Sequence, residues 1–228
     1  MTVALGDIAI DVVRTNRKKT ASLRMRDGAV QLVVPKRMSK RRINAIIDEK
    51  ANWIRRAVEQ DAAAPKFQAK TYQPGETFMH LGQTYVLTPT TDALDWPMIQ
   101  GKALVVSGAD SAQIKVQIDA WYLHEATQQL TTRTAKFGTL MDLSPNNIKT
   151  KYYKSRWGAC SPTGDLTYNW RIIMAPAEVV DYVVVHELAH LRHHNHSRQF
   201  WGCVAEAMPD YKDHNRWLKQ NGHLLRLE

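Results

Sequence analysis

The chain has 228 residues, of which 44% are hydrophobic and 23% charged, and its formal net charge is +9. This composition is typical of a globular protein and excludes a disordered or fibrous chain. No apolar run reaches the roughly 20 residues of a membrane-spanning helix, and Asp7 and Asp11 interrupt the apolar start, so neither a signal peptide nor a membrane partner is expected. Two cysteines exclude a disulfide framework and favour a reducing, cytoplasmic location.

The first part of the chain shows the alternation of apolar and polar residues that is typical of β-strands. It covers residues 3–34, and the pair Asp27-Gly28 predicts a hairpin turn within it. Ser39 is a candidate N-cap, and the apolar residues after it repeat at helical spacing. Strand patterns return at residues 77–90 and 102–108.

Helical spacing begins at Asp110 and continues to Gly138, a residue type that favours helix termination. Two strand-like segments follow at residues 147–153 and 165–174. Pro176 fits the first turn of a further helix, and the rest of the chain is mainly helical. We find no internal repeat in the sequence.

The order of these elements predicts an α+β fold with a β-rich N-terminal half. We place the boundary at residue 105, which gives a β-rich region with one helix (1–105) and a mainly helical domain (106–228). Eleven lysines and arginines lie between Arg14 and Arg42. Such a basic stretch can attract nucleic acid or nucleotides, or it can simply keep the protein soluble.

The strongest motif is HExxH, formed by His186, Glu187 and His190. On a helix, residues four apart lie on the same face, so both imidazoles can bind one metal ion. Glu187 is then placed to act as a general base on a water molecule that the metal activates. The apolar helix around the motif is an unfavourable place for unpaired imidazoles and a carboxylate.

A catalytic zinc ion usually takes three protein ligands, and two residues are candidates for the third. His196 follows His190 by six residues, the spacing of the long zincin signature HExxHxxGxxH. His193 stands at the glycine position of that signature, so we expect Asn195 to adopt the left-handed conformation that the turn requires. Glu206 is the alternative, and we favour His196 because the site already contains imidazoles.

The segment 152–201 resembles the YgjP-like metallopeptidase-domain family, whose members are related to SprT-like zincins. The resemblance lies in the motifs "RWGACS", "NWRIIMAP", "DYVVVHELAHL" and "NHSRQFW". Ala159 replaces a usual serine, and Tyr168 replaces a smaller or aliphatic residue. The segment 13–54 is similar to the N-terminal part of the family, whereas residues 89–110 match nothing that we can place.

The resemblance implies a zincin-like fold in which His186, His190 and His196 bind Zn²⁺ and Glu187 is catalytic. In zincins an extended substrate pairs with a strand beside the active helix. We therefore predict four substrate-binding residues near that strand, although the two tryptophans could equally be core residues. They are Trp157, Asn169, Trp170 and Arg171.

Three functions are consistent with these features. The first is a zinc-dependent peptidase that acts on a peptide or protein. The second is a metal-dependent hydrolase of nucleotides or other phosphoanhydrides, which basic side chains in the cleft would favour. The third is a non-catalytic module that binds nucleic acid or protein and contains a structural metal, which four protein ligands would favour.

Overall fold

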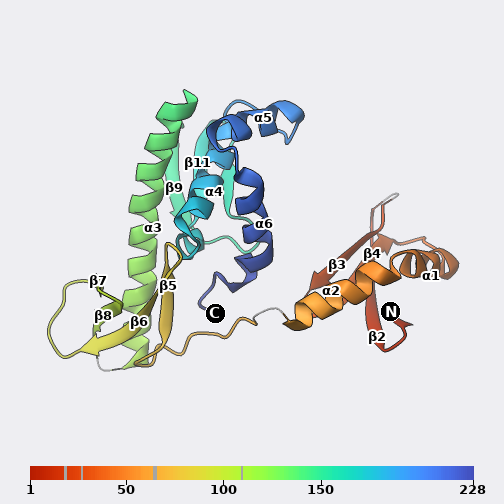
Figure 1. Ribbon diagram of the computed structural model, residues 1–228, viewed down its shortest axis with the longest axis horizontal. Helices are drawn as coiled ribbons and strands as arrows, with labels where there is room; N and C mark the ends of the chain where they lie inside the picture. The colour runs from red at the N-terminus through yellow and green to blue at the C-terminus, as the bar shows by residue number, and fades with distance from the viewer. Residues whose placement is uncertain (18–19, 27, 64–65, 109) are drawn as a thin grey trace. The chain divides into compact units, whose positions relative to one another are not determined.

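The computed structural model describes residues 1–17, 20–26, 28–63, 66–108 and 110–228 (Figure 1). The fold is α+β, with strands concentrated in the N-terminal half and helices in the C-terminal half, as predicted. Two compact units, Met1–Lys66 and Phe67–Glu228, make up the chain. Their boundary precedes the expected boundary at residue 105, because the strands between residues 77 and 107 share a core with the C-terminal helices.

Unit 1 consists of a four-stranded sheet and two helices. The strands are β1 (Thr2–Leu5), β2 (Ile8–Thr15), β3 (Ser22–Arg26) and β4 (Ala29–Pro35), in the order β1-β2-β4-β3. The central strands β2 and β4 are parallel, and the outer pairs are antiparallel. The strands predicted at residues 3–34 are confirmed, and Gly28 between β3 and β4 has φ +76°; Asp27 lies outside the described residues.

The helix predicted after Ser39 is present, but it is divided at Lys50 into α1 (Lys40–Glu49) and α2 (Ala51–Ala63). Ser39 caps α1, because its side chain accepts a hydrogen bond from the backbone N–H of Arg42 at 3.3 Å. Apolar side chains from one face of the sheet and from both helices form the core of unit 1. They are Ile10, Val12, Val30, Leu32, Val34, Ile43, Ile47 and Ile54.

Unit 2 begins with a second four-stranded sheet that repeats the topology of the first. Its strands are β5 (Thr77–His80), β6 (Gln83–Thr90), β7 (Met98–Gln100) and β8 (Ala103–Ser107), in the order β5-β6-β8-β7. Here too the central strands β6 and β8 are parallel and the outer pairs antiparallel. Strand β7 lies in the stretch that the sequence left unplaced.

The long helix α3 (Ser111–Met141) follows this sheet. Asp110 caps it by accepting hydrogen bonds from the backbone N–H groups of Ala112 and Gln113, both at 2.9 Å. The helix continues through Gly138, where termination was predicted, and ends at Asp142, which has φ +52°. The expected stop was therefore wrong by one turn.

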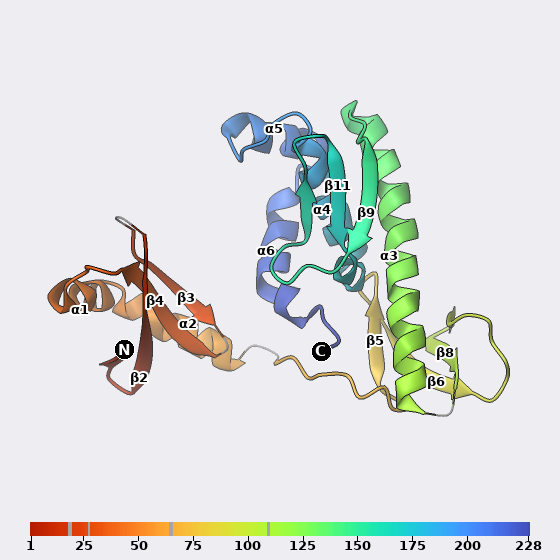
Figure 2. The same cartoon turned by 180° about the vertical axis from the view of Figure 1, so that it is seen from behind.

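The remaining elements are the HExxH helix, α4, and the strands and helices around it. They are β9 (Asn147–Lys151), β10 (Gly158–Cys160), β11 (Asp165–Asn169), the 3₁₀ helix η1 (Trp170–Met174), α4 (Ala177–Ala189), α5 (Arg198–Ala207), α6 (Tyr211–Asn221) and the 3₁₀ helix η2 (Gly222–Leu224). The strands pair in the order β10-β11-β9. Helix α4 runs between α3 and α6 in both views (Figures 1 and 2). None of the described helices is long and apolar enough to cross a membrane.

Candidate metal centre

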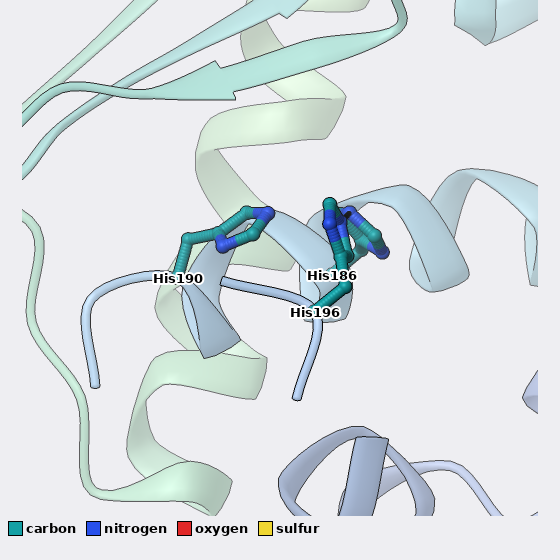
Figure 3. Close-up of side chains that lie close together, drawn as sticks. All are labelled: His186, His190 and His196. Carbon is teal, nitrogen blue, oxygen red and sulfur yellow. Dashed lines mark hydrogen bonds between the residues drawn. The ribbon is translucent and has the colours of Figure 1, made fainter. Parts of the chain in front are cut away.

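Three histidines from the end of α4 and the start of α5 meet at one point. His186 lies in the last turn of α4, His190 directly follows that helix, and His196 precedes Ser197, the cap of α5. One ring nitrogen from each lies within 4.8 Å of those of the other two. Figure 3 shows the ring of His190 pointing toward those of His186 and His196.

The spacing of these nitrogens suits a bound metal ion. The Nε2 atoms of His186 and His196 are 3.1 Å apart. Two imidazole nitrogens at about 2.0–2.1 Å from a tetrahedral zinc ion would be about 3.3–3.4 Å apart. Glu206, the alternative third ligand, is exposed on α5 and is not part of the three-histidine group. With three donors, a tetrahedral ion would keep one open position.

The turn that brings His196 back to the site does not use a left-handed residue. Asn195 and His193 both have negative φ, so the expected left-handed conformation of Asn195 is wrong. Instead, the backbone N–H of His193 donates to the carbonyl of Ala189 at 2.9 Å, and the side chain of Asn195 accepts from the N–H of Ser197 at 3.2 Å. The turn therefore tolerates histidine at the glycine position.

Neighbouring groups orient the imidazoles. Nδ1 of His190 lies 3.1 Å from the carbonyl oxygen of His193, so this nitrogen carries the proton and Nε2 keeps its lone pair for a metal. Nδ1 of His186 is buried and has no hydrogen-bond partner among the described residues, so ring packing fixes this side chain. The fully buried ring of Phe200 lies 4.9, 4.5 and 4.8 Å from those of His186, His190 and His196.

Burial keeps His186 and His190 neutral, the form that metal ions bind. It lowers the pKa of His186 to about 3, and His190 and His196 lower it further by charge repulsion. The pKa of His190 is also lowered, mainly by burial. Both side chains are therefore ready to coordinate a cation at neutral pH.

Glu187 is 6% exposed and lies against strand β10. A Cβ atom at Gly158 would lie 2.5 Å from both Cγ and Oε1 of Glu187, so only glycine leaves room for this carboxylate. Burial raises the pKa of Glu187 to about 8, and the positive charge of Arg156 opposes part of the rise. A divalent cation nearby would lower this pKa and favour the carboxylate.

A pocket of about 310 Å³ opens beside Glu187. Its lining includes His186, Glu187, Gly158, Arg156 and Lys219, together with Trp157, one of the four predicted substrate-binding residues. Arg156 and Lys219 were not expected at the site, because basic residues at unrelated sequence positions give no spacing signal.

The other three predicted substrate-binding residues do not line this pocket. Asn169 is buried, and its side-chain amide donates to the carbonyls of Tyr153 and Arg156 at 2.9 and 3.0 Å, which orders the loop before β10. Trp170 and Arg171 line a different pocket of unit 2, and Arg171 also donates to the Tyr153 carbonyl at 3.1 Å. The sequence reasoning missed Phe200 and Gly158, although both lie within the motifs quoted above.

The three histidines form a candidate metal site. The family model described as "YgjP-like, metallopeptidase domain" matches residues 19–221, and the chain belongs to this family. The family implies a divalent metal and a peptide or protein substrate. Among curated proteins, no sequence matches the chain.

Two solved structures are similar to part of the chain. One is the metallopeptidase zymogen abylysin of Pyrococcus abyssi, with 21% identity, 40% of this chain and 92% of that chain covered, and a TM-score of 0.37. The other is the metallopeptidase zymogen jannalysin of Methanocaldococcus jannaschii, with 18% identity, coverage of 40% and 94%, and a TM-score of 0.36. Both TM-scores are below 0.5, so the functional assignment rests on the family match and on the site.

Proposed function

We propose that this protein is a zinc-dependent metallopeptidase, with His186, His190 and His196 as zinc ligands and Glu187 as general base. The observation that carries the proposal is the meeting of three imidazole nitrogens within 4.8 Å beside a buried glutamate. An all-imidazole donor set favours zinc over magnesium, calcium and manganese. Cys160 and Cys203 are both free, which supports a reducing, cytoplasmic location.

The bound ion would supply Lewis acidity, which makes water a nucleophile at neutral pH and polarises the carbonyl of the substrate. Glu187 accepts the proton of the attacking water and passes it to the leaving amine. Gly158 leaves the space that this carboxylate occupies, and burial of Glu187 excludes competing solvent. His193 holds the proton on Nδ1 of His190 through its backbone carbonyl.

Strand β10 supports a peptide as the substrate. It lies at the edge of its sheet, and the backbone groups of Trp157 and Ser161 bond to β11 at 2.8 and 2.9 Å. Because successive residues of a strand point their backbone groups to opposite sides, those of Gly158 and Cys160 face away from β11. An extended peptide can pair with this edge next to Glu187.

Metal content and peptide cleavage test the proposal. We expect the wild type to hold about one zinc ion per chain, His196→Ala to lose it, and the matched controls His194→Ala and Glu206→Gln to retain it. Glu187→Gln should keep the metal and lose cleavage of casein peptides. Loss of zinc from Glu206→Gln, with retention by His196→Ala, would overturn the ligand assignment; full activity of Glu187→Gln would overturn the general base.

A second candidate is hydrolysis of a nucleotide phosphoanhydride at the same site. Arg156 and Lys219 favour it, because both are exposed, both line the pocket with Glu187, and neither pairs with a carboxylate among the described residues. Hydrolysis of nucleoside triphosphates by the wild type, lost in Glu187→Gln and weakened in Arg156→Gln and Lys219→Gln, would establish this activity. Peptide cleavage without triphosphate hydrolysis would exclude it.

A further inference from the structure

Almost all of the net positive charge of this protein belongs to unit 1. Residues 1–66 contain 15 of the 31 lysines and arginines but only 7 of the 22 acidic residues, which leaves a net charge of +8. Residues 67–228 contain the other 16 basic and 15 acidic residues, a net charge of +1. Unit 2, which carries the three-histidine cluster, is therefore nearly neutral, and unit 1 is strongly basic.

Within unit 1 the described basic side chains gather where β2 and β4 end and α1 begins. We call this region the basic end; its described members are Arg14, Arg17, Lys36, Arg37, Lys40, Arg41 and Arg42, all exposed. Parallel pairing brings the ends of β2 and β4 together, and the backbone N–H of Lys36 donates to the carbonyl of Thr15 at 3.0 Å. Arg14 donates to the carbonyls of Lys36 and Met38 at 2.6 and 2.9 Å, which fixes the loop that leads into α1.

The described carboxylates of unit 1 lie elsewhere. Asp7 is in the turn before β2, about 25 Å from the far end of that eight-residue strand. Asp61 lies near Gly28, where β4 starts rather than where it ends. Asp48 and Glu49 are at the end of α1, where the pKa of Glu49 is lowered mainly by Lys50 and also by the positive charge of Arg42. Asp7 and Asp61 are separated from the basic end by more than the Debye length of about 8 Å at physiological salt. Glu49 is paired with Lys50, so it compensates only part of the field, at Arg42.

Asp11 lies within β2 and points to the opposite face of the strand from Arg14, and Glu59 lies on α2. Among the described residues of unit 1, the one ion pair joins Lys50 to Glu49, outside the basic end. Basic residues also occupy the first turn of α1, where the helix dipole disfavours positive charge. This arrangement costs folding stability and is stabilised when a bound anion neutralises it.

We propose that the basic end of unit 1 is a docking surface for the phosphate backbone of a nucleic acid. Five of its seven described members are arginines, whose planar guanidinium groups match phosphate oxygens in pairs. Stable membrane binding takes an apolar or lipid anchor beside a basic patch, and the core of a protein interface is depleted in charged residues. The exposed large hydrophobic residues in the described part of unit 1 are Met1 and Trp53, and neither lies at the basic end. The inference goes beyond the proposed peptidase and does not depend on it.

Binding of the full-length protein to labelled oligonucleotides tests this surface. Fluorescence anisotropy would be recorded with single-stranded and duplex DNA and RNA of mixed sequence, at salt concentrations from about 50 to 200 mM. We expect the triple variant Arg37→Gln, Lys40→Gln and Arg41→Gln to reduce the slope of log affinity against log salt by about 3, and the affinity on the order of a hundredfold. The preference among the four probes identifies the natural class of nucleic acid.

The matched control removes the same charge from unit 2. Lys102, Lys136 and Lys149 are exposed, and their replacement by glutamine should leave the slope unchanged. Equal weakening by both triple variants would overturn the proposal, because net charge alone would then explain binding. Lack of binding to every oligonucleotide, or tighter binding to vesicles of equal parts phosphatidylcholine and phosphatidylserine, would also overturn it. Circular dichroism of both variants confirms that they fold.

Discussion

The two four-stranded sheets have the same topology but different partners. In each, a four-residue strand and an eight-residue strand form a hairpin (β1–β2 and β5–β6), and the longer strand pairs in parallel with a strand of a second hairpin. A capped helix follows each sheet. The first sheet shares a core with α1 and α2, whereas the second shares a core with α3, η1 and α4.

This difference shows that strand pattern does not decide which unit a sheet belongs to. Val12 faces Leu32 across the central pair of the first sheet, and Leu87 faces Leu104 at the corresponding place in the second. All four side chains are buried, but the first pair belongs to the core of unit 1 and the second to the core around the metal centre. The residues against which each pair packs, rather than the local sequence, assign the two sheets to different units.

Truncation of the central leucines should have the largest effect on stability. Leu32 and Leu104 are both 0% exposed, so each change to alanine should cost about 2–5 kcal/mol of unfolding free energy. We expect Leu32→Ala to destabilise unit 1 and leave metal content unchanged, and Leu104→Ala to destabilise unit 2 and weaken metal retention. Urea unfolding would be followed by tryptophan fluorescence, since six of the seven tryptophans lie in unit 2. If both variants shift every transition equally, the units unfold as one body.

Substitution of Gly158 should reduce the rate of peptide cleavage more than it reduces folding stability. In Gly158→Ala the new Cβ forces the Glu187 side chain to move, so kcat/KM for peptide cleavage should fall on the order of a hundredfold while zinc content stays constant. Gly202→Ala is the matched control on α5, because a Cβ there meets nothing within 4 Å. Equal activity of the two variants would show that Glu187 does not need its present position.

The three-histidine cluster was more predictable from the sequence than the fold around it. HExxH fixes the relative positions of His186, Glu187 and His190 through helix geometry alone, and His196 joins them as the zincin spacing suggested. The role of Gly158 was hidden, because its contact with Glu187 joins residues far apart in the sequence. The basic residues of the pocket were hidden for the same reason.

The predicted strand boundaries were wrong where hydrogen bonding between strands, rather than the alternation of apolar and polar residues, determines the structure. β10 has three residues without apolar alternation, and it forms because β11 offers a complementary register. The strand predicted at residues 165–174 ends at Asn169, whose side chain accepts a hydrogen bond from the N–H of Arg171 at 3.3 Å and starts η1. The boundary at residue 105 failed because both sheets show the same strand pattern, so both were assigned to one half.

Gly6 and Gly82 lie in the turn of the first hairpin of each sheet, and their substitution by alanine should cost different amounts of unfolding free energy. Gly6 and Gly82 both have positive φ, +63° and +78°, so each substitution introduces backbone strain of about 1 kcal/mol. A Cβ at Gly82 would also lie 2.9 Å from Cα of Pro176, the residue before α4, whereas a Cβ at Gly6 meets nothing within 4 Å. We expect Gly82→Ala to cost about 2 kcal/mol more than Gly6→Ala in urea unfolding. Equal costs would mean that Pro176 moves aside freely.

The caps of the helices that follow the two sheets should give the smallest difference. Asp110 accepts two backbone hydrogen bonds at the start of α3 and carries a negative charge there, whereas Ser39 accepts one at the start of α1. Removal by alanine should therefore cost about 1–2 kcal/mol for Asp110 and about 1 kcal/mol or less for Ser39, measured on the unfolding of the respective unit. Asp110→Asn keeps the hydrogen bonds and removes only the charge, so it should lose about 0.5 kcal/mol. If Asp110→Asn costs as much stability as Asp110→Ala, the negative charge at the helix terminus, rather than the capping hydrogen bonds, stabilises α3, the helix that packs against α4.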